Sequence, residues 1–394
     1  MRLEDMFFKA YFLRFLSGKM VYRIFFYIVF FAFLLAYRPA QAKLCPVEVP
    51  PGDTLVRKME TDFDLGLRIF KSRFRYVDTT RIHKFRLKNN IQIFSGTSVV
   101  DYSFSSNASA YLEHSPFTYI ASSSAYGGVE LNYKFLSIAL SRGIPGTYLN
   151  KDIRGINDIS LGTSYFWRQL GIRASFSNYT GLLHGDAENG YEITKGLSSL
   201  RIGAQLYYIH NARRYSYSAG SAQSEMQRHS AGSFLVMISP GFQRFKSEST
   251  ILPDSIDKEM YFGKYAGMRK LMYTGFDVMP GYGFNIVAAK GHLYFSPTGF
   301  LGPGVYFYRL KTHEATGTGM SYAISGSFML NAGYNGERFF VNARIKSSFS
   351  DLILNPSEIT NSNTDFQLVV GYRFADLEHR LPASPRKLWD RVIK

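Results

Sequence analysis

The 394-residue chain has one cysteine, two tryptophans and few charged residues, which make up 19% of its length. The lone Cys45 excludes a disulfide within the chain, and no group of Cys and His residues has the spacing of a zinc site. The motifs G-x-S-x-G, G-x-x-x-x-G-K and H-E-x-x-H are all missing. We therefore assign no catalytic residue and expect neither a metal site nor a cofactor.

The chain also lacks the apolar excess of a helical membrane protein. Its mean hydropathy of -0.11 is too polar for a bundle of transmembrane helices, although 46% of the residues are apolar. Strands in which apolar and polar residues alternate produce such an average. The 34 Phe, 28 Tyr and 34 Gly residues are typical of many strands joined by tight turns.

The N-terminal region contains an apolar run at residues 24–37, between Arg23 and the A-x-A sequence of residues 40–42. This pattern predicts a secretory signal peptide over residues 1–42, with Met20 as an alternative start. The run is shorter than the roughly 20 residues that a spanning helix needs, which disfavours the alternative of an uncleaved anchor. Cleavage removes six basic and two acidic residues, which lowers the net charge from +16 to +12.

The mature chain therefore stays basic. An exported basic protein first meets anionic lipid head groups and the phosphates of lipopolysaccharide. The sequence contains no nucleic-acid-binding motif. We expect outer-membrane lipids and lipopolysaccharide, rather than nucleic acid, as its partners.

Residues 43–83 begin with several prolines and show no clean periodicity, which is typical of a periplasmic arm or a plug. Residues 84–374 instead follow a period of two. Around residue 200, for example, Ile202 and Leu206 alternate with Arg201 and polar neighbours. One face of such a strand suits lipid and the other suits water.

The Asn335-Gly336 pair predicts a two-residue hairpin turn, in which Tyr334 pairs with Glu337. Stepping outward in this register collects the apolar side chains of both arms on one face. Each arm carries about ten alternating residues, and a tilted strand needs roughly 9 to 11 to cross a bilayer. Strands of soluble proteins are usually nearer five or six residues. The length therefore favours a membrane strand.

We predict an all-β protein: an antiparallel transmembrane β-barrel of about 12 strands, with a range of 10 to 14, over residues 84–374. Residues 181–196 and 246–271 are polar and are predicted to be loops. Residues 375–394 form a C-terminal periplasmic tail, since an even strand number leaves both termini in the periplasm. The last strand ends on the aromatic Phe374, which resembles the strand that outer-membrane assembly machinery recognises. We expect a location in the outer membrane.

Three stretches carry a family resemblance: LSIALSRGIPG at residues 136–146, DISLGTSYFWRQLGIRASFSNYTG at 158–181 and LNAGYNGERFF at 330–340. The region from about residue 75 to residue 375 resembles a domain-of-unknown-function family of Bacteroidetes-type bacteria, whose members carry a signal peptide and a predicted outer-membrane barrel. The resemblance implies a Gram-negative outer membrane. The family has no established activity, so the resemblance implies no catalytic residue.

The polar faces of the predicted strands place more cations than carboxylates in the lumen. The predicted lumen-facing charges are Lys134, Arg168, Arg173, Arg201, Arg344, Lys346 and Arg373, against Glu130, Asp158, Asp277 and Asp365. Rings of Arg and Lys favour anions in a pore. The alternative is that these charges pair across a filled lumen and only stabilise the barrel.

Our leading hypothesis is a non-enzymatic barrel, either a narrow channel for small anionic solutes or a structural envelope protein. The runner-up is an outer-membrane lipid-modifying hydrolase. His229 and Ser230 are direct neighbours, but neighbours on a strand point to opposite faces, so they do not suggest a catalytic pair. A soluble periplasmic β-sandwich or lipocalin-like binder is a third alternative. The sequence leaves the solute and the oligomeric state open.

Overall fold

Antiparallel strands make up most of the chain that the computed structural model describes. The described residues are 78–106, 117–122, 125–133, 136–144, 147, 157–166, 169–186, 190–252, 258–259, 266–354 and 357–375. All of them belong to one unit, residues 76–394. The predicted signal peptide, residues 43–77 of the predicted arm or plug, and the predicted tail beyond residue 375 lie outside the described residues.

Thirteen strands form the main sheet. They are β2 (Asn89–Ser106), β3 (Phe117–Ser122), β4 (Ala125–Tyr133), β5 (Leu136–Gly143), β6 (Asn157–Phe166), β7 (Leu170–Asp186), β8 (Gly190–Ile209), β10 (Ala231–Lys246), β11 (Lys270–Ala288), β12 (Leu293–Lys311), β13 (Thr316–Asn335), β14 (Phe339–Leu354) and β15 (Ser357–Phe374). A second sheet pairs β1 (Ile82–Lys84) with β9 (Glu225–Gln227), and two short helices are α3 (Tyr217–Ser221) and η4 (Ala289–Gly291).

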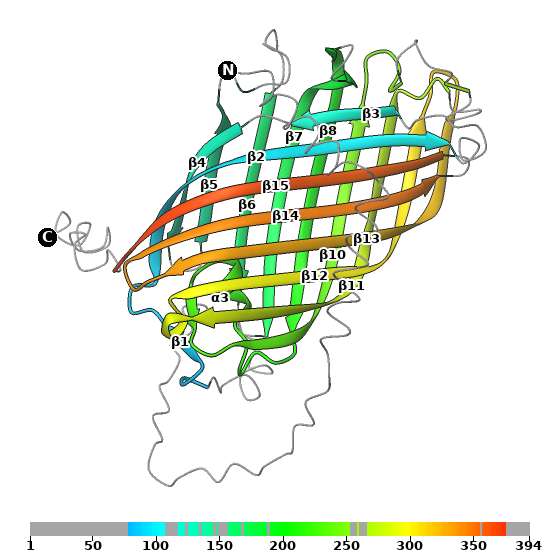
Figure 1. Cartoon of the computed structure of the whole chain (residues 1–394). Coiled ribbons are helices and arrows are strands. Elements are labelled where there is room, and N and C mark those ends of the chain that lie inside the picture. The colour runs from blue at the N-terminus through cyan, green and yellow to red at the C-terminus, as the bar shows by residue number, and fades with distance from the viewer. Residues whose placement is uncertain are drawn as a thin grey trace, which may run out of the picture. The chain divides into compact units, whose positions relative to one another are not determined.

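The main sheet closes on itself because β15 pairs with β2 along the length of both strands (Figure 1). From β2 the ring continues through β3 to β7, β8 and then β10 to β15, which gives a closed barrel of 10 antiparallel strands. The strands β4 and β5 extend from β2, and β6 pairs with β7. Counting β4, β5 and β6 in place of β3 gives 12 strands, although no ladder joins β5 to β6 in the described residues. The predicted antiparallel barrel of about 12 strands, with its range of 10 to 14, is therefore confirmed.

The outer face of the barrel is apolar, as the alternation predicted. On β8, Ile202 and Leu206 are 46% and 42% exposed, and on β15 Leu368 and Val370 are 52% and 55% exposed. Inward neighbours on the same strands include Arg201 and Gln205 of β8 and Gln367 of β15, while Val369 of β15 joins a small buried cluster with Phe94 and Phe340. From β10 onward the main strands have 16 to 20 residues, which exceeds the roughly 9 to 11 needed to cross a bilayer. No helix in the described part of the chain is long and apolar enough to cross a membrane.

The predicted register of the β13–β14 hairpin is wrong by four residues, although the assignment of faces is right because the shift is even. Tyr334 pairs with Val341 instead of Glu337. Asn335 is the last paired residue of β13 and does not belong to the turn. The turn comprises residues 336–338. The physical reason is that the Asn335 side chain, 1% exposed, is used inside the barrel, where it hydrogen-bonds to other segments.

The predicted loop at residues 181–196 is also wrong. Strands β7 and β8 continue through it and pair up to Asp186 and Gly190. These strands are longer than a membrane crossing requires, so their ends extend where polar residues suit both faces. The predicted loop at residues 246–271 agrees better, since the described residues between β10 and β11, which are 247–252, 258–259 and 266–269, belong to no strand.

Apolar clusters fill the lumen near both ends of the barrel. One cluster, at the end where β8 and β10 are joined, includes Tyr217 of α3, Leu235, Met237 and Phe300. The other lies at the opposite end, where Ile251 between β10 and β11 packs with inward side chains of the strands. We call these the plug end and the loop end. Both clusters are buried, so apolar side chains occupy the lumen on either side of its middle.

Candidate anion-binding cavity

A segment between β8 and β10 turns back into the barrel at the plug end, and we call residues 210–230 the plug. All five residues of α3 are buried, and Ser216 caps the helix by accepting a hydrogen bond from the Ala219 backbone N–H. Burial raises the pKa of the Tyr217 hydroxyl well above its ordinary value. The sequence predicted a periplasmic arm or a plug in residues 43–83. Of those residues, the described β1 pairs with β9 of the plug.

Two of the predicted lumen-facing cations hold the plug. Arg344 donates three hydrogen bonds, from Nε to Asn331 Oδ1 at 3.1 Å, from Nη1 to Gln367 Oε1 at 3.3 Å and from Nη2 to the backbone oxygen of Ser221 at 2.9 Å. It thus ties β14 directly to α3. This arrangement corresponds to the structural role that the sequence left open as an alternative.

Arg373 is the more deeply buried of the two, at 1% exposure. Its guanidinium lies over the rings of Phe85 and Phe340, 3.8 Å and 4.5 Å from their centroids. It donates hydrogen bonds to Asn335 Oδ1 and to the backbone oxygens of Gly336 and Gln223. Because Gln223 belongs to the plug, Arg373 joins the wall, the β13–β14 turn and the plug at one point.

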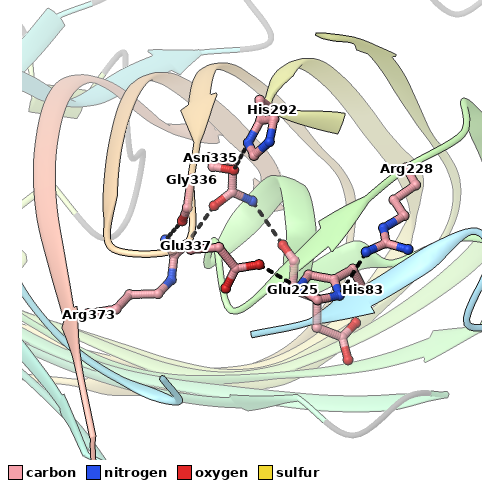
Figure 2. A network of polar contacts seen from close by, with 8 residues as sticks. All are labelled: His83, Glu225, Arg228, His292, Asn335, Gly336, Glu337 and Arg373. Carbon is pink, nitrogen blue, oxygen red and sulfur yellow. Dashed lines mark hydrogen bonds and ion pairs between the residues drawn. The ribbon is translucent and has the colours of Figure 1, made fainter. Parts of the chain in front are cut away.

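Figure 2 shows how the same turn reaches β1 and β9. Asn335 donates from Nδ2 to the backbone oxygen of Glu225 at 2.9 Å. His83 Nε2 lies 2.6 Å from Glu337 Oε1, and Arg228 Nη2 lies 3.2 Å from His83 Nδ1. Since arginine can only donate, Nδ1 accepts and Nε2 carries the proton toward Glu337. The network fixes β1 and the plug against the barrel.

A polar cavity of about 790 Å³ lies in the lumen between the two apolar clusters. Among its lining residues are Arg173 of β7, Arg201 of β8 and Lys346 of β14, together with Asp277 and Asp365. Five of the predicted lumen-facing charges therefore meet in one space.

The carboxylates of the cavity are held by hydroxyl groups. Asp277 accepts hydrogen bonds from Tyr306 Oη and Ser325 Oγ, both at 2.7 Å, and Asp365 accepts one from Tyr126 Oη at 2.5 Å. In the described part of the chain, none of the three cations Arg173, Arg201 and Lys346 has a carboxylate within 4.0 Å or a hydrogen bond. The cavity thus presents positive charge that its own acids do not neutralise directly.

A row of small residues creates the space. Gly162 of β6 pairs with Ser175 of β7, Ser175 with Gly203 of β8, and Gly203 with Gly241 of β10, and all four line the cavity. A Cβ atom added at any of the three glycines would meet nothing nearer than 3.7 Å. Of these four positions only Ser175 carries a side chain, and the cavity occupies the space that the three glycines leave.

The other predicted lumen-facing charges either do not line this cavity or lie outside the described residues. Glu130 is on β4, near enough to Arg173 and Arg344 for electrostatic interaction. Lys134, Arg168 and the side chain of Asp158 lie outside the described residues. Sequence reasoning missed the glycine row, which was visible only as single glycines at inward positions of separate strands. It also missed the amides Asn361 and Asn363, which line the cavity with Oδ1 atoms that lack a partner among the described residues.

The described residues bring no three His, Cys, Asp or Glu side chains together as a metal-holding group. No side-chain hydrogen bond joins His229 to Ser230 within that part of the chain, and Ser230 Oγ instead accepts one from the Val287 backbone N–H at 3.1 Å. His184 has a closer arrangement: its Nδ1 lies 2.9 Å from Thr194 Oγ1, and its Nε2 lies 3.5 Å from Glu192 Oε2.

A family described as "Domain of unknown function (DUF4421)" matches residues 76–374. The chain belongs to this family. The match covers the whole DUF4421 barrel from before β1 to the end of β15. The Bacteroidetes origin that the resemblance implies stays a prediction. None of the curated proteins with which the sequence was compared matches it.

Solved structures similar to this DUF4421 protein include several outer-membrane proteins. The outer membrane protease OmpT from Escherichia coli is 10% identical with a TM-score of 0.34, and the match covers 74% of this chain and 98% of that one. Ail, the attachment invasion locus protein of Yersinia pestis, is 11% identical with a TM-score of 0.19, covering 73% and 100%. The toluene transporter TodX of P. putida is 8% identical with a TM-score of 0.15, covering 73% and 91%.

Proposed function

We propose that this protein is a non-enzymatic barrel of a Gram-negative outer membrane that binds an anionic group in its central cavity. The apolar outer face of the strands supports a membrane location, and the predicted signal peptide supports export. Outer-membrane lipids, lipopolysaccharide and the assembly machinery are its proposed partners.

The observation that carries the proposal is the imbalance inside the cavity. Arg173, Arg201 and Lys346 lack carboxylate partners among the described residues, whereas Asp277 and Asp365 accept hydrogen bonds from neutral hydroxyls. A cation removed from water is costly unless an opposite charge compensates it. An anion in the cavity would supply that compensation.

Because both ends of the lumen are filled with side chains, we favour binding of an anion in the cavity over free passage of anions through the barrel. Apolar clusters occupy the lumen on both sides of the cavity, and hydrogen bonds from Arg344 and Arg373 hold the plug. A narrow channel for small anions would require the plug to move. A purely structural barrel would leave these half-buried cations without an opposite charge in contact with them.

The test is stabilisation of the purified, folded protein by inorganic phosphate. A ligand that binds only the folded state raises the free energy of unfolding, by about 2.7 kcal/mol when its concentration is 100 times Kd. We expect phosphate to raise the urea midpoint above that in chloride of equal ionic strength. The triple variant Arg173→Gln, Arg201→Gln and Lys346→Met should lose this effect.

The matched control is Arg309→Gln, which removes an exposed cation of β12 away from the cavity. It should respond to phosphate as the unchanged protein does. Equal phosphate effects in the triple variant and the control would exclude the cavity as the anion site.

The second candidate is a lipid-modifying hydrolase, and the contact between Thr194 and His184 at 2.9 Å is the observation that favours it. A hydroxyl beside an imidazole, with Glu192 on the far nitrogen, has the composition of a nucleophile, base and orienting group. Incubation with labelled phospholipid should then release a product, and Thr194→Val and His184→Gln should each abolish it. Absence of turnover by the unchanged protein in detergent and in bilayers would exclude this candidate.

A further inference from the structure

The barrel wall is interrupted between β5 and β6. Strand β5 pairs with β4, and β6 pairs with β7, but no ladder joins β5 to β6 in the described residues, although the two strands contact each other. Their facing edges therefore carry backbone N–H and C=O groups outside any ladder. Such edges are costly in contact with lipid, and closed barrels normally avoid them. We call this interruption, between residues 136–143 and 157–166, the seam.

The central cavity reaches the seam from inside. Ser141 and Gly143 of β5 line the cavity from one side of the seam, and Leu161 and Gly162 of β6 line it from the other. Leu161 is also 50% exposed on the outer face of the barrel. A residue that borders both surfaces indicates that the wall is thin or open at this place.

Arg142 provides an independent observation at the same place. It is exposed on the outward face of β5, the face of Leu140, which is 66% exposed, and it also lines the cavity. The register sets Arg142 opposite Gly127, and Gly127 opposite Ser95 near the middle of β2. An arginine facing lipid near the middle of a membrane strand is strongly disfavoured. A negatively charged group passing the seam would give Arg142 a counter-charge.

We propose that the seam is a lateral opening through which an amphipathic anion, an acyl chain with a phosphate or carboxylate head, passes between the membrane and the cavity. The inference rests on the proposed function, because the head group would be held by Arg173, Arg201 and Lys346. The apolar chain would lie along the outward face of Leu140 and Leu161. The cavity volume of about 790 Å³ is within the range of pockets for ligands of this size, roughly 300 to 1,000 Å³.

The experiment closes the seam chemically. In a Cys45→Ser background, Ser141→Cys and Gly162→Cys are joined by a short flexible bis-maleimide, and the protein is placed in nanodiscs of zwitterionic lipid. The reference is the same variant with both cysteines capped by N-ethylmaleimide, which adds similar bulk without a bridge. The control pair is Ser347→Cys and Thr364→Cys, which face each other across the intact β14–β15 ladder and do not line the cavity.

The readout is the rate at which radiolabelled dodecyl phosphate binds. We expect the bridge across the seam to slow or abolish uptake relative to the capped protein, and the bridge between residues 347 and 364 to leave uptake unchanged. Equal rates in bridged and capped seam variants would overturn the lateral opening. Failure of dodecyl phosphate to bind any variant, while inorganic phosphate still stabilises the protein, would overturn the ligand class but leave the proposed function standing.

The same assay separates two sources of the ligand. If a bilayer lipid is the ligand, phosphatidylglycerol in the nanodisc will compete with dodecyl phosphate for the cavity. If the ligand is a dissolved amphiphile, phosphatidylglycerol will not compete. Both results support the opening, provided that the bridge across the seam still slows uptake.

Discussion

Arg344 on β14 and Ser221 at the end of α3 are joined by a hydrogen bond of 2.9 Å from the guanidinium to a backbone oxygen. The contact links a strand of the wall to a plug more than a hundred positions earlier in the chain. Arg344, which the alternation pattern predicted to face the lumen, therefore holds the plug inside the lumen.

Replacement of Arg344 by Met should release α3. A hydrogen bond from a charged group contributes about 1.5 to 3 kcal/mol, so we expect a loss of that order in the free energy of unfolding by urea. Amide hydrogen exchange in residues 217–225 should also become faster. Arg309→Gln, which removes an exposed cation, should change neither quantity. Unchanged exchange in the Arg344→Met protein would show that the plug is held without this contact.

Arg373 and Asn335 should be energetically coupled. Asn335 Oδ1 accepts a hydrogen bond from Arg373 at 2.6 Å, and both side chains also hold the plug. Residues in one network show coupling of about 0.5 to 3 kcal/mol in double-mutant cycles. We expect Arg373→Lys and Asn335→Ala to be less than additive when combined. Strict additivity of the two unfolding free energies would contradict the network.

The two-residue alternation predicted the barrel and its faces because that period depends only on which side chains meet water or lipid. The hairpin register could not be predicted in this way. Asn335 is typical of a turn in the sequence, but in the structure its buried side chain donates a hydrogen bond to the backbone oxygen of Glu225. The plug also escaped prediction: residues 210–230 have no period, and their place is set by contacts with Arg344 and Arg373, which are distant in sequence. Likewise, the cavity depends on the alignment of glycines across strands.

The outward face of β15 should tolerate charge only near its ends. Leu368 is 52% exposed and lies opposite Ser95, near the middle of β2. Substitution of a lysine on the lipid face at mid-membrane costs about 2 to 4 kcal/mol, against 0 to 1 near the interface. Leu368→Lys should therefore lower the unfolding free energy in lipid vesicles by that amount, and Thr316→Lys at the start of β13 by much less. Similar costs at both positions would contradict a membrane-facing surface.

Filling the glycine row should remove anion binding without unfolding the barrel. A Cβ atom at Gly203 would meet nothing nearer than 3.7 Å, whereas one at Gly275 would collide with the backbone oxygen of Val305. We expect Gly203→Leu to fold with normal heat-modifiable gel mobility and to lose phosphate stabilisation. Gly275→Leu should be destabilised, since overpacking costs about 1 to 3 kcal/mol or more. Retained phosphate stabilisation in Gly203→Leu would mean that the anion binds elsewhere.

X-ray diffraction from crystals soaked in tungstate, a heavy analogue of phosphate, would show whether Arg173, Arg201 and Lys346 hold an anion in the lumen. Anomalous scattering locates the metal of the anion without reference to any assumed position. We expect a peak inside the cavity within contact distance of these three side chains, and its loss in the Arg173→Gln, Arg201→Gln, Lys346→Met protein. An empty cavity with peaks only on the outer surface would show that the lumen does not bind the anion.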